Sequence, residues 1–261
     1  MTLDIGDILN GWPYEPEQLS VRRIRGDDGR EKIQVRLDLG LLQMETTGRP
    51  DGERPHGHES LLDYHEHRLR RHKAAHGTDR GFDLDEEACE QLRAEGVMYY
   101  HRYIAEYVLE DFEAVERDAT RNLRLLDFCR AHARREADRY ALEQYRPYIL
   151  MMCTRARARL ALGEDRPKTA LQIIRRGIAD IREFVAEFAD DEVGEAGAER
   201  EIAILKALAG EIEEGMPPDP LEKLRKELSR AVSEERYEDA ASIRNRLDRL
   251  ARGDGQGHEG G

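Results

Sequence analysis

Hydrophobic and polar positions alternate along the first 55 residues of the chain as they do in β-strands. From Lys32 to Leu41 every second residue is apolar and faces away from the charged or polar residues between them. This period of two predicts one half-buried strand over residues 32–41. A shorter strand is predicted at 19–25, and the glycine and aspartate residues of 26–29 suit a hairpin turn. The apolar positions change phase after Gly40, as at a bulge or at the start of a third strand. We therefore expect a small antiparallel sheet of two or three strands in residues 1–55.

From about residue 59 onward, apolar residues recur every three or four positions, which is the spacing of amphipathic helices. Asp83, followed by Glu86, is the predicted cap of the second helix. On this helix one predicted apolar stripe comprises Tyr100, Tyr103, Ile104, Tyr107 and Val108. Because helical patterns fill most of the chain, the predicted fold class is mainly α with a small N-terminal sheet. Four helices are predicted at 59–75, 134–162, 165–188 and 198–214, and two more are predicted to begin after Asp83 and after Asp111.

A weak internal repeat relates residues 114–128 to residues 170–184. Both are amphipathic runs, and each follows a helix that ends in a Glu-Asp step. The pattern predicts antiparallel helical hairpins and loosely resembles a tetratricopeptide array, whose period is about 34 residues. Such an array offers a concave face to partner proteins. The alternative is a helical bundle without a groove.

Proline residues divide the helical part of the chain. The segment 216–220 reads Met-Pro-Pro-Asp-Pro, which breaks a helix and predicts a linker. It separates a helical body at 56–215 from a predicted helical hairpin at 221–251. The glycine-rich end at 252–261 is predicted to be disordered.

Composition narrows the range of functions. The chain has 42 Lys and Arg against 55 Asp and Glu, a formal charge of -13. A net-acidic chain is a poor general nucleic-acid binder, because binding to phosphates requires clustered cations. No stretch approaches the roughly 18 to 20 apolar residues that span a bilayer, and Asp4 and Asp7 lie where a signal peptide would be basic. Cys89, Cys129 and Cys153 are far apart and suit reduced, buried thiols. We expect a cytoplasmic protein.

The most informative pattern lies in the C-terminal hairpin. Its first helix carries a leucine-spaced stripe that includes Leu224 and Leu228, and the turn falls near 233–236. On the second helix we expect Tyr237 to cover the turn. The small side chains of Ala240 and Ala241 are both expected to let the helices approach closely. Two helices of this length bury little area by themselves, so an apolar face is available to a partner or to a second copy.

The hairpin resembles the UVR motif shared by UvrB and UvrC. The motif has Glu, an aromatic residue, Glu, two alanines and an Arg-Asp step before the closing aliphatic positions. Residues 235–247 match it with Glu235, Tyr237, Glu238, Ala240, Ala241, Arg244 and Leu247. Arg236 stands where an apolar residue is frequent, and Asn245 stands where Asp is usual. The resemblance covers about 30 residues. The candidate partner-binding residues are Leu224, Leu228, Tyr237, Ala240, Ala241, Ile243, Arg244 and Leu247.

The resemblance implies protein–protein coupling rather than catalysis, because the hairpin joins UvrB to UvrC and also occurs in regulators of Clp-type proteases. The chain carries no helicase P-loop and lacks the Cys-x-x-Cys pairs of those regulators. We therefore expect a non-enzymatic adaptor without a cofactor. The alternatives are an excision-repair accessory that contacts UvrB or UvrC and DNA, and a regulator of a Clp-type protease.

Three further patterns allow a functional and a structural interpretation. His72 and His76 are four residues apart and could share a metal ion on a helix, or they belong to a polar, histidine-rich helix.

The tyrosines from 99 to 107 could stack on bases, although packing in a core or groove explains their spacing better. The predicted strands carry the best basic patch, which exposed strand faces often have without binding nucleic acid. Its residues are Arg22, Arg23, Arg25, Lys32 and Arg36.

Overall fold

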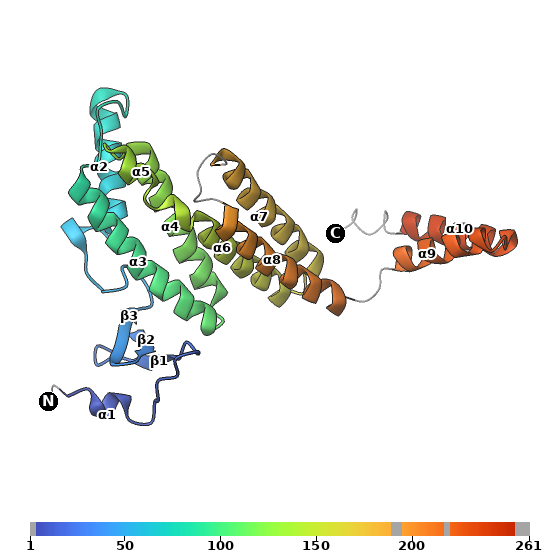
Figure 1. The fold of residues 1–261 in the computed structure, drawn as a ribbon, viewed down its shortest axis with the longest axis horizontal. Helices are drawn as coiled ribbons and strands as arrows, with labels where there is room; N and C mark the ends of the chain where they lie inside the picture. Colours follow the sequence, from blue (N-terminus) through green and yellow to red (C-terminus); the bar gives the residue numbers. More distant parts are fainter. Residues whose placement is uncertain (1–3, 189–194, 217–219, 254–261) are drawn as a thin grey trace, which may run out of the picture. The chain divides into compact units, whose positions relative to one another are not determined.

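The computed structural model describes residues 4–188, 195–216 and 220–253, and the described chain is mainly α, as predicted (Figure 1). It divides into two compact units, Met1–Gly210 and Glu211–Gly261. No helix among the described residues is long and apolar enough to cross a membrane. Three residues of the predicted linker, 217–219, and the tail at 254–261 lie outside the described residues, so the linker and the disordered tail stay predictions.

The first unit begins with a short helix, α1 (Gly6–Leu9), and an antiparallel sheet of β1 (Val21–Arg25), β2 (Glu31–Leu37) and β3 (Gly40–Glu45), in that order. The prediction of one strand over 32–41 is wrong. Leu37 pairs with Gly40, so the chain turns at Asp38 and Leu39, and the Leu39 side chain is 88% exposed. The period-two pattern continues through the turn by coincidence, and the phase change at Gly40 marks the start of β3.

The sheet buries one face against the C-terminal part of a long helix, α3 (Glu86–Val108). Ile33, Val35 and Met44 from the sheet form a small core with Ala105 of this helix. A three-stranded sheet of this size is marginal alone. Packing against α3 therefore supplies the apolar contact that stabilises it.

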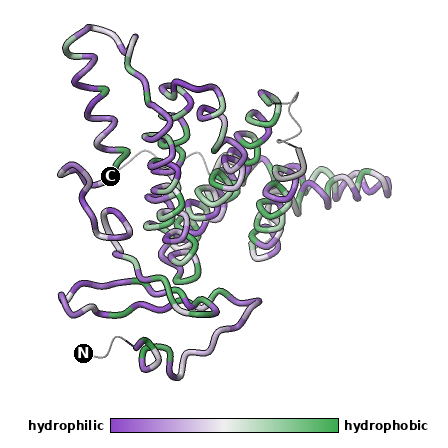
Figure 2. Tube along the Cα trace, turned by 60° about the vertical axis from the view of Figure 1, so that its left-hand side comes forward, coloured by the Kyte–Doolittle hydropathy of each residue, from purple (hydrophilic) through white to green (hydrophobic). Residues whose placement is uncertain are grey.

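Antiparallel helices follow one another through the rest of this unit (Figure 1). Helix α3 packs on α4, α4 packs on α6, and α6 packs on α7. Hydrophobic and hydrophilic residues alternate along these helices, as expected of amphipathic elements that face both a core and solvent (Figure 2). The other helices that begin in this unit are α2 (Leu61–His76), α4 (Phe112–His132), α5 (Glu136–Tyr140), α6 (Arg146–Gly163), α7 (Pro167–Glu187) and α8 (Glu195–Gly215), with 3-10 turns η1 (Pro55–Gly57) and η2 (Glu143–Tyr145). The last residues of α8 belong to the second unit.

The structure corrects two predicted helix boundaries. The cap of α3 is Asp85, whose carboxylate accepts a hydrogen bond from the Ala88 amide at 2.9 Å. Asp83, the predicted cap, instead pairs with Arg134 at 2.8 Å. The single helix predicted at 134–162 is three elements, α5, η2 and α6. Pro147 occupies the first turn of α6, where its missing amide proton is harmless and a new helix can begin.

The apolar stripe predicted on α3 is only partly correct. Tyr103 is buried, but Tyr100 is 37% exposed and Val108 is 46% exposed. The buried face of α3 also contains charged side chains, Glu95, Arg102 and Glu106. Each has a charged partner on α4, although one carboxylate oxygen of Glu106 is buried without a hydrogen-bond partner. This pairing could not be seen from hydrophobic periodicity.

The same turn joins three pairs of helices. Glu110, Asp165 and Glu235 each adopt a left-handed conformation, with φ of 58°, 55° and 57°. In each turn the following amide, from Asp111, Arg166 or Arg236, donates to the carbonyl five residues earlier at 2.8–2.9 Å. This is the Schellman arrangement that ends many helices. Helical hairpins are thus present, but the first two turns are spaced far more widely than the about 34 residues of a tetratricopeptide repeat, and that likeness stays an interpretation.

Candidate partner-binding site

The C-terminal hairpin consists of α9 (Pro220–Ser233) and α10 (Tyr237–Gly253), which pack against each other. Ala231, near the end of α9, is completely buried, and Ala240, in the first turn of α10, is 7% exposed. Their methyl groups let the two backbones approach closely beside the turn. Leu224 is buried farther along α9. These three residues form the interior of the hairpin.

Charged side chains surround the turn. The Arg236 guanidinium pairs with Glu234 at 2.8 Å and with Asp239 at 2.6 Å, and Arg230 pairs with Glu234 at 2.9 Å. The neighbouring Arg230 and Arg236 hold the pKa of the Glu234 carboxyl below its ordinary value. All of these groups lie in solvent, where ion pairs contribute little to stability. The motif often has an apolar residue at the position of Arg236. In this chain the Arg236 side chain therefore lies on the surface of the turn and does not enter the interior.

Helix geometry assigns the remaining apolar residues to one side of the hairpin. On α9, Leu228 lies three residues before Ala231 and Val232 lies one residue after it. On α10, Tyr237 lies three residues before Ala240 and Ala241 lies one residue after it. At about 100° per residue, both offsets turn a side chain toward the same flank of its helix. Because α9 and α10 run antiparallel, the two flanks lie on one side of the hairpin.

We call this side the docking face, and Arg244 of α10 also lies on it. Val232 is 48% exposed and Tyr237 is 68% exposed, while Ala241 and Arg244 are exposed and Leu228 is half-buried. The opposite side of the hairpin is charged, with Glu227, Arg230, Asp239 and Arg246. The apolar residues on the docking face are available for contact with another protein.

The predicted partner-binding residues are therefore divided by the structure. Leu224 and Ala240 lie in the hairpin interior, and Leu228, Ile243 and Leu247 are half-buried. Two expectations about this region are wrong. Tyr237 does not cover the turn, since most of its side chain is exposed, and Ala241 faces solvent and takes no part in closing the hairpin. The side chains of residues 220–223 and 249–253 lie outside the described residues.

Val232 is not among the predicted contact residues, although it lies on the docking face and is 48% exposed. The available signal is its position four residues after Leu228, which puts both on one flank of α9. Hydrophobic periodicity alone does not separate Val232 from the adjacent Ala231, which is buried in the interior.

The site is thus an exposed helical hairpin with one apolar face, the form of a protein-interaction module. Residues 219–252 match the family model of the UvrB/uvrC motif, so the hairpin is a UVR motif, as predicted. No curated protein and no solved structure matches the chain.

The predicted basic patch on the strands does not form a free cationic surface. Arg23 pairs with Asp111 at 2.5 Å and with Glu31 at 3.1 Å, and Lys32 pairs with Asp28 at 3.1 Å and with Glu45.

The other three arginines of this patch also have partners. Arg22 lies over the Trp12 ring at 3.9 Å and donates to Gln34, Arg25 donates to the Gly29 carbonyl, and Arg36 donates to the Trp12 carbonyl. Nearby acidic groups and backbone carbonyls therefore compete with any phosphate for these side chains.

The two candidate metal-binding histidines lie close together on the histidine-rich helix α2. The rings of His72 and His76 are 4.5 Å apart, but His72 also contacts the Arg80 carbonyl at 3.1 Å. Among the described residues, no group of three or more His, Cys, Asp or Glu side chains is placed to hold a metal ion. His65 is buried, and this burial lowers its pKa to about 4.

The tyrosines and cysteines occupy structural positions. Tyr99 and Tyr103 are buried and Tyr107 lies under the Arg155 guanidinium at 4.2 Å, so the tyrosines of α3 do not share one exposed stacking surface. The three cysteines are free and buried. Burial raises the pKa of Cys89 to about 11 and that of Cys129 to about 12, which keeps both thiols protonated and unreactive at neutral pH.

Proposed function

We propose that this protein is a non-enzymatic adaptor that binds a partner protein through the docking face of its UVR motif. One observation carries the proposal. The hairpin closes on Leu224, Ala231 and Ala240, which leaves Val232 and Tyr237 largely exposed. Partners bury exposed aromatic and aliphatic side chains with a gain of roughly 25 cal/mol per Å² of apolar surface, and tyrosine is enriched at interaction hot spots.

The repair-accessory alternative shares this docking step and adds a contact with DNA. The ion pairs of Arg23 and Lys32 give that second contact little support. The proposal therefore concerns a protein partner, whose identity decides between an excision-repair protein, a Clp-type protease system and another pathway.

The proposal is tested with a matched pair of substitutions on α10. Ala241→Glu places a charge on the docking face, whereas Ser242→Glu places the same charge one residue away, outside this face. Both positions are exposed, so both variants should keep the hairpin closed. Tagged full-length chain, unaltered or carrying either change, is used to capture proteins from a lysate of the source organism, and captured proteins are identified by mass spectrometry.

We expect the unaltered chain and Ser242→Glu to capture the same partner, and Ala241→Glu to lose it. Burying an unpaired carboxylate in an interface costs several kcal/mol, enough to remove capture. A partner that all three proteins retain equally would place the binding site elsewhere on the chain and refute the docking face.

A further inference from the structure

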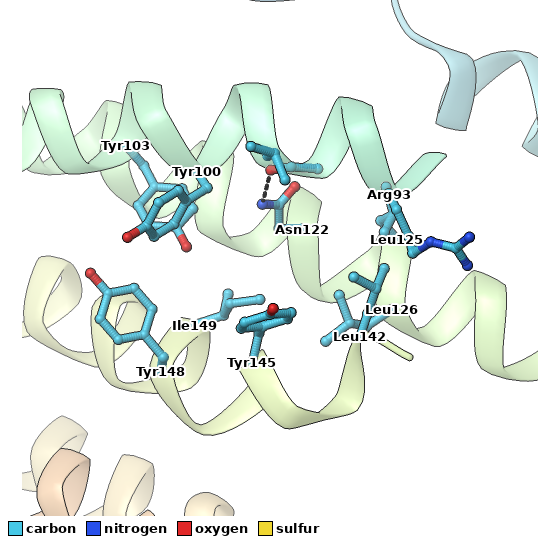
Figure 3. A pocket seen from close by; sticks show the side chains of 12 residues that line it. Arg93, Tyr100, Tyr103, Asn122, Leu125, Leu126, Leu142, Tyr145, Tyr148 and Ile149 are labelled. Atoms are coloured by element: carbon cyan, nitrogen blue, oxygen red, sulfur yellow. Dashed lines mark hydrogen bonds between the residues drawn. The ribbon is translucent and has the colours of Figure 1, made fainter. Parts of the chain in front are cut away.

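A cavity of about 440 Å³ lies in the first unit between α3, α4 and the segment formed by η2 and α6 (Figure 3). One end is formed by tyrosines, Tyr100 and Tyr103 from α3 and Tyr148 from α6, whose hydroxyl groups point toward the same region (Figure 3). The other end is formed by aliphatic side chains, among them Leu126 and Leu142. The cavity therefore has a hydrogen-bonding end and an apolar end.

The tyrosine hydroxyl groups have no hydrogen-bond partner within the part of the chain that the structure describes. Tyr103 is the most informative, because its side chain is only 1% exposed and its hydroxyl faces the cavity (Figure 3). The hydroxyl borders the open cavity and is not sealed inside the protein, so a water molecule or a ligand atom can be its hydrogen-bond partner. Burial raises the pKa of Tyr103 and raises that of Tyr148 to about 12. Both are neutral phenols near neutral pH and can donate a hydrogen bond.

Other polar groups in the cavity wall are already paired. The Arg93 guanidinium donates to Asp138 at 2.8 Å and points away from the tyrosine end (Figure 3). The Asn122 amide donates to the Gly96 carbonyl at 2.9 Å and accepts from Arg121 at 3.0 Å. A charged ligand group at the tyrosine end would therefore find hydrogen-bond donors but no counter-ion from the wall.

We propose that this cavity binds an uncharged small molecule with a flat ring body and one hydrogen-bonding oxygen or nitrogen atom. The polar atom lies at the hydroxyl groups of Tyr103 and Tyr148, and the ring lies against Tyr145 and the aliphatic end. The volume is within the range of small-molecule sites, about 300 to 1,000 Å³. The rim is open, since Val97 is 52% exposed and Tyr145 is 53% exposed. This binding site is separate from the docking face and does not depend on the proposed adaptor function.

The probe for the first test is Nile red, an uncharged fluorescent ring compound with a carbonyl oxygen, titrated with the full chain. We expect one saturable site. Val97→Trp fills the rim of the cavity and should weaken binding by about tenfold or more. Val108→Trp, at a similarly exposed position on the same helix but outside the cavity wall, is the matched control and should bind like the unaltered chain. Absence of saturable binding, or equal binding by the two tryptophan variants, overturns the proposal.

A second variant tests the hydroxyl group without disturbing the fold. Tyr103→Phe removes a hydroxyl that has no protein partner, so its melting temperature should equal or exceed that of the unaltered chain. Loss of one hydrogen bond should weaken Nile red binding by about 3- to 10-fold. Diphenylhexatriene, an apolar probe without oxygen, should bind Tyr103→Phe and the unaltered chain equally. An unchanged Nile red affinity, or the same loss for both probes, refutes the role of this hydroxyl.

Discussion

The guanidinium of Arg102 on α3 donates two hydrogen bonds to the carboxylate of Asp118 on α4, at 2.6 Å and 3.0 Å. Both side chains are 1% exposed. A third hydrogen bond, of 2.9 Å, runs from Arg102 to the Glu45 carbonyl at the end of β3. One buried arginine thus connects the sheet to the first helical hairpin.

Removing either partner of this pair should cost more than removing both. Asp118→Ala leaves the buried Arg102 guanidinium without its bidentate carboxylate, and each single change should lower the free energy of unfolding by up to about 3–5 kcal/mol. Arg102→Ala should lie at the low end of this range, because Asp118 keeps the partly exposed Arg117 at 2.8 Å. The double variant Arg102→Met/Asp118→Leu removes both charges of this pair and should lose less than either single variant. Chemical denaturation measures all three.

The control for these variants is a half-exposed pair. Arg23 and Asp111 are each 35% exposed, and Arg23→Ala should cost about 1 kcal/mol or less. If Arg102→Ala were no more destabilising than Arg23→Ala, the buried pair would not stabilise the junction between sheet and helices.

Glu106 should make the stability of the protein depend on pH. Its burial, together with the nearby Asp118 carboxylate, raises the pKa of Glu106 from 4.5 to about 8. The folded state therefore holds this proton at pH values where the unfolded chain has released it. The stabilisation is complete below about pH 4.5 and is lost as the pH rises toward 8. Denaturation between about pH 5 and 8 should show a loss of about 3–4 kcal/mol from this group.

The amide variant Glu106→Gln isolates this effect from other titrations. Glutamine cannot ionise, so the variant should lack the Glu106 contribution and gain stability relative to the unaltered chain as the pH rises. Glu90→Gln, at an exposed position on the same helix, should follow the unaltered chain at every pH. Parallel curves for Glu106→Gln and the unaltered chain would show that Glu106 has an ordinary pKa.

Local sequence signals predicted most of the helices and the UVR motif. The helix that starts at Pro167 follows a Glu-Asp step that the structure places in a left-handed turn at Asp165. The hairpin turn near 233–236 was predicted because polar residues interrupt two apolar stripes, and it lies where expected. Such features depend on neighbours in the chain, so one sequence is enough to find them.

Features that depend on distant residues were not predictable in the same way. Glu95 is completely buried because it accepts hydrogen bonds from the Leu61 and Leu62 amides at 2.7 Å and 3.2 Å and pairs with Arg121. Nothing near Glu95 in the sequence indicates these partners.

The cavity has the same character, because its walls come from α3, α4, η2 and α6, and only folding brings them together. The exposure of Ala241 could not be predicted either, because it depends on which residues of α9 and α10 contact each other.

The two neighbouring alanines of the UVR motif should respond differently to enlargement. Ala240→Leu inserts a branched side chain between the helices opposite the buried Ala231, and overpacking of this kind costs about 1–3 kcal/mol. A two-helix hairpin is marginal, so amide hydrogen exchange should show loss of protection along α9 and α10. Ala241→Leu, on the docking face, should keep the protection of the unaltered chain. Equal loss in both variants would contradict the assignment of Ala240 alone to the interior.

Glycine at the hairpin turn should stabilise the UVR motif. Glu235 has a φ of 57°, a conformation that costs an L-residue roughly 1 kcal/mol and costs glycine almost nothing. Glycine also gives the unfolded chain more freedom, so the net gain from Glu235→Gly should be about 0.5 kcal/mol. Slower hydrogen exchange in α9 and α10 would report it. Glu227→Gly, at an exposed position within α9, provides the opposite case, because glycine inside a helix costs about 0.5–1 kcal/mol. If both substitutions speeded exchange, the left-handed turn would not be the conformation that limits the stability of the hairpin.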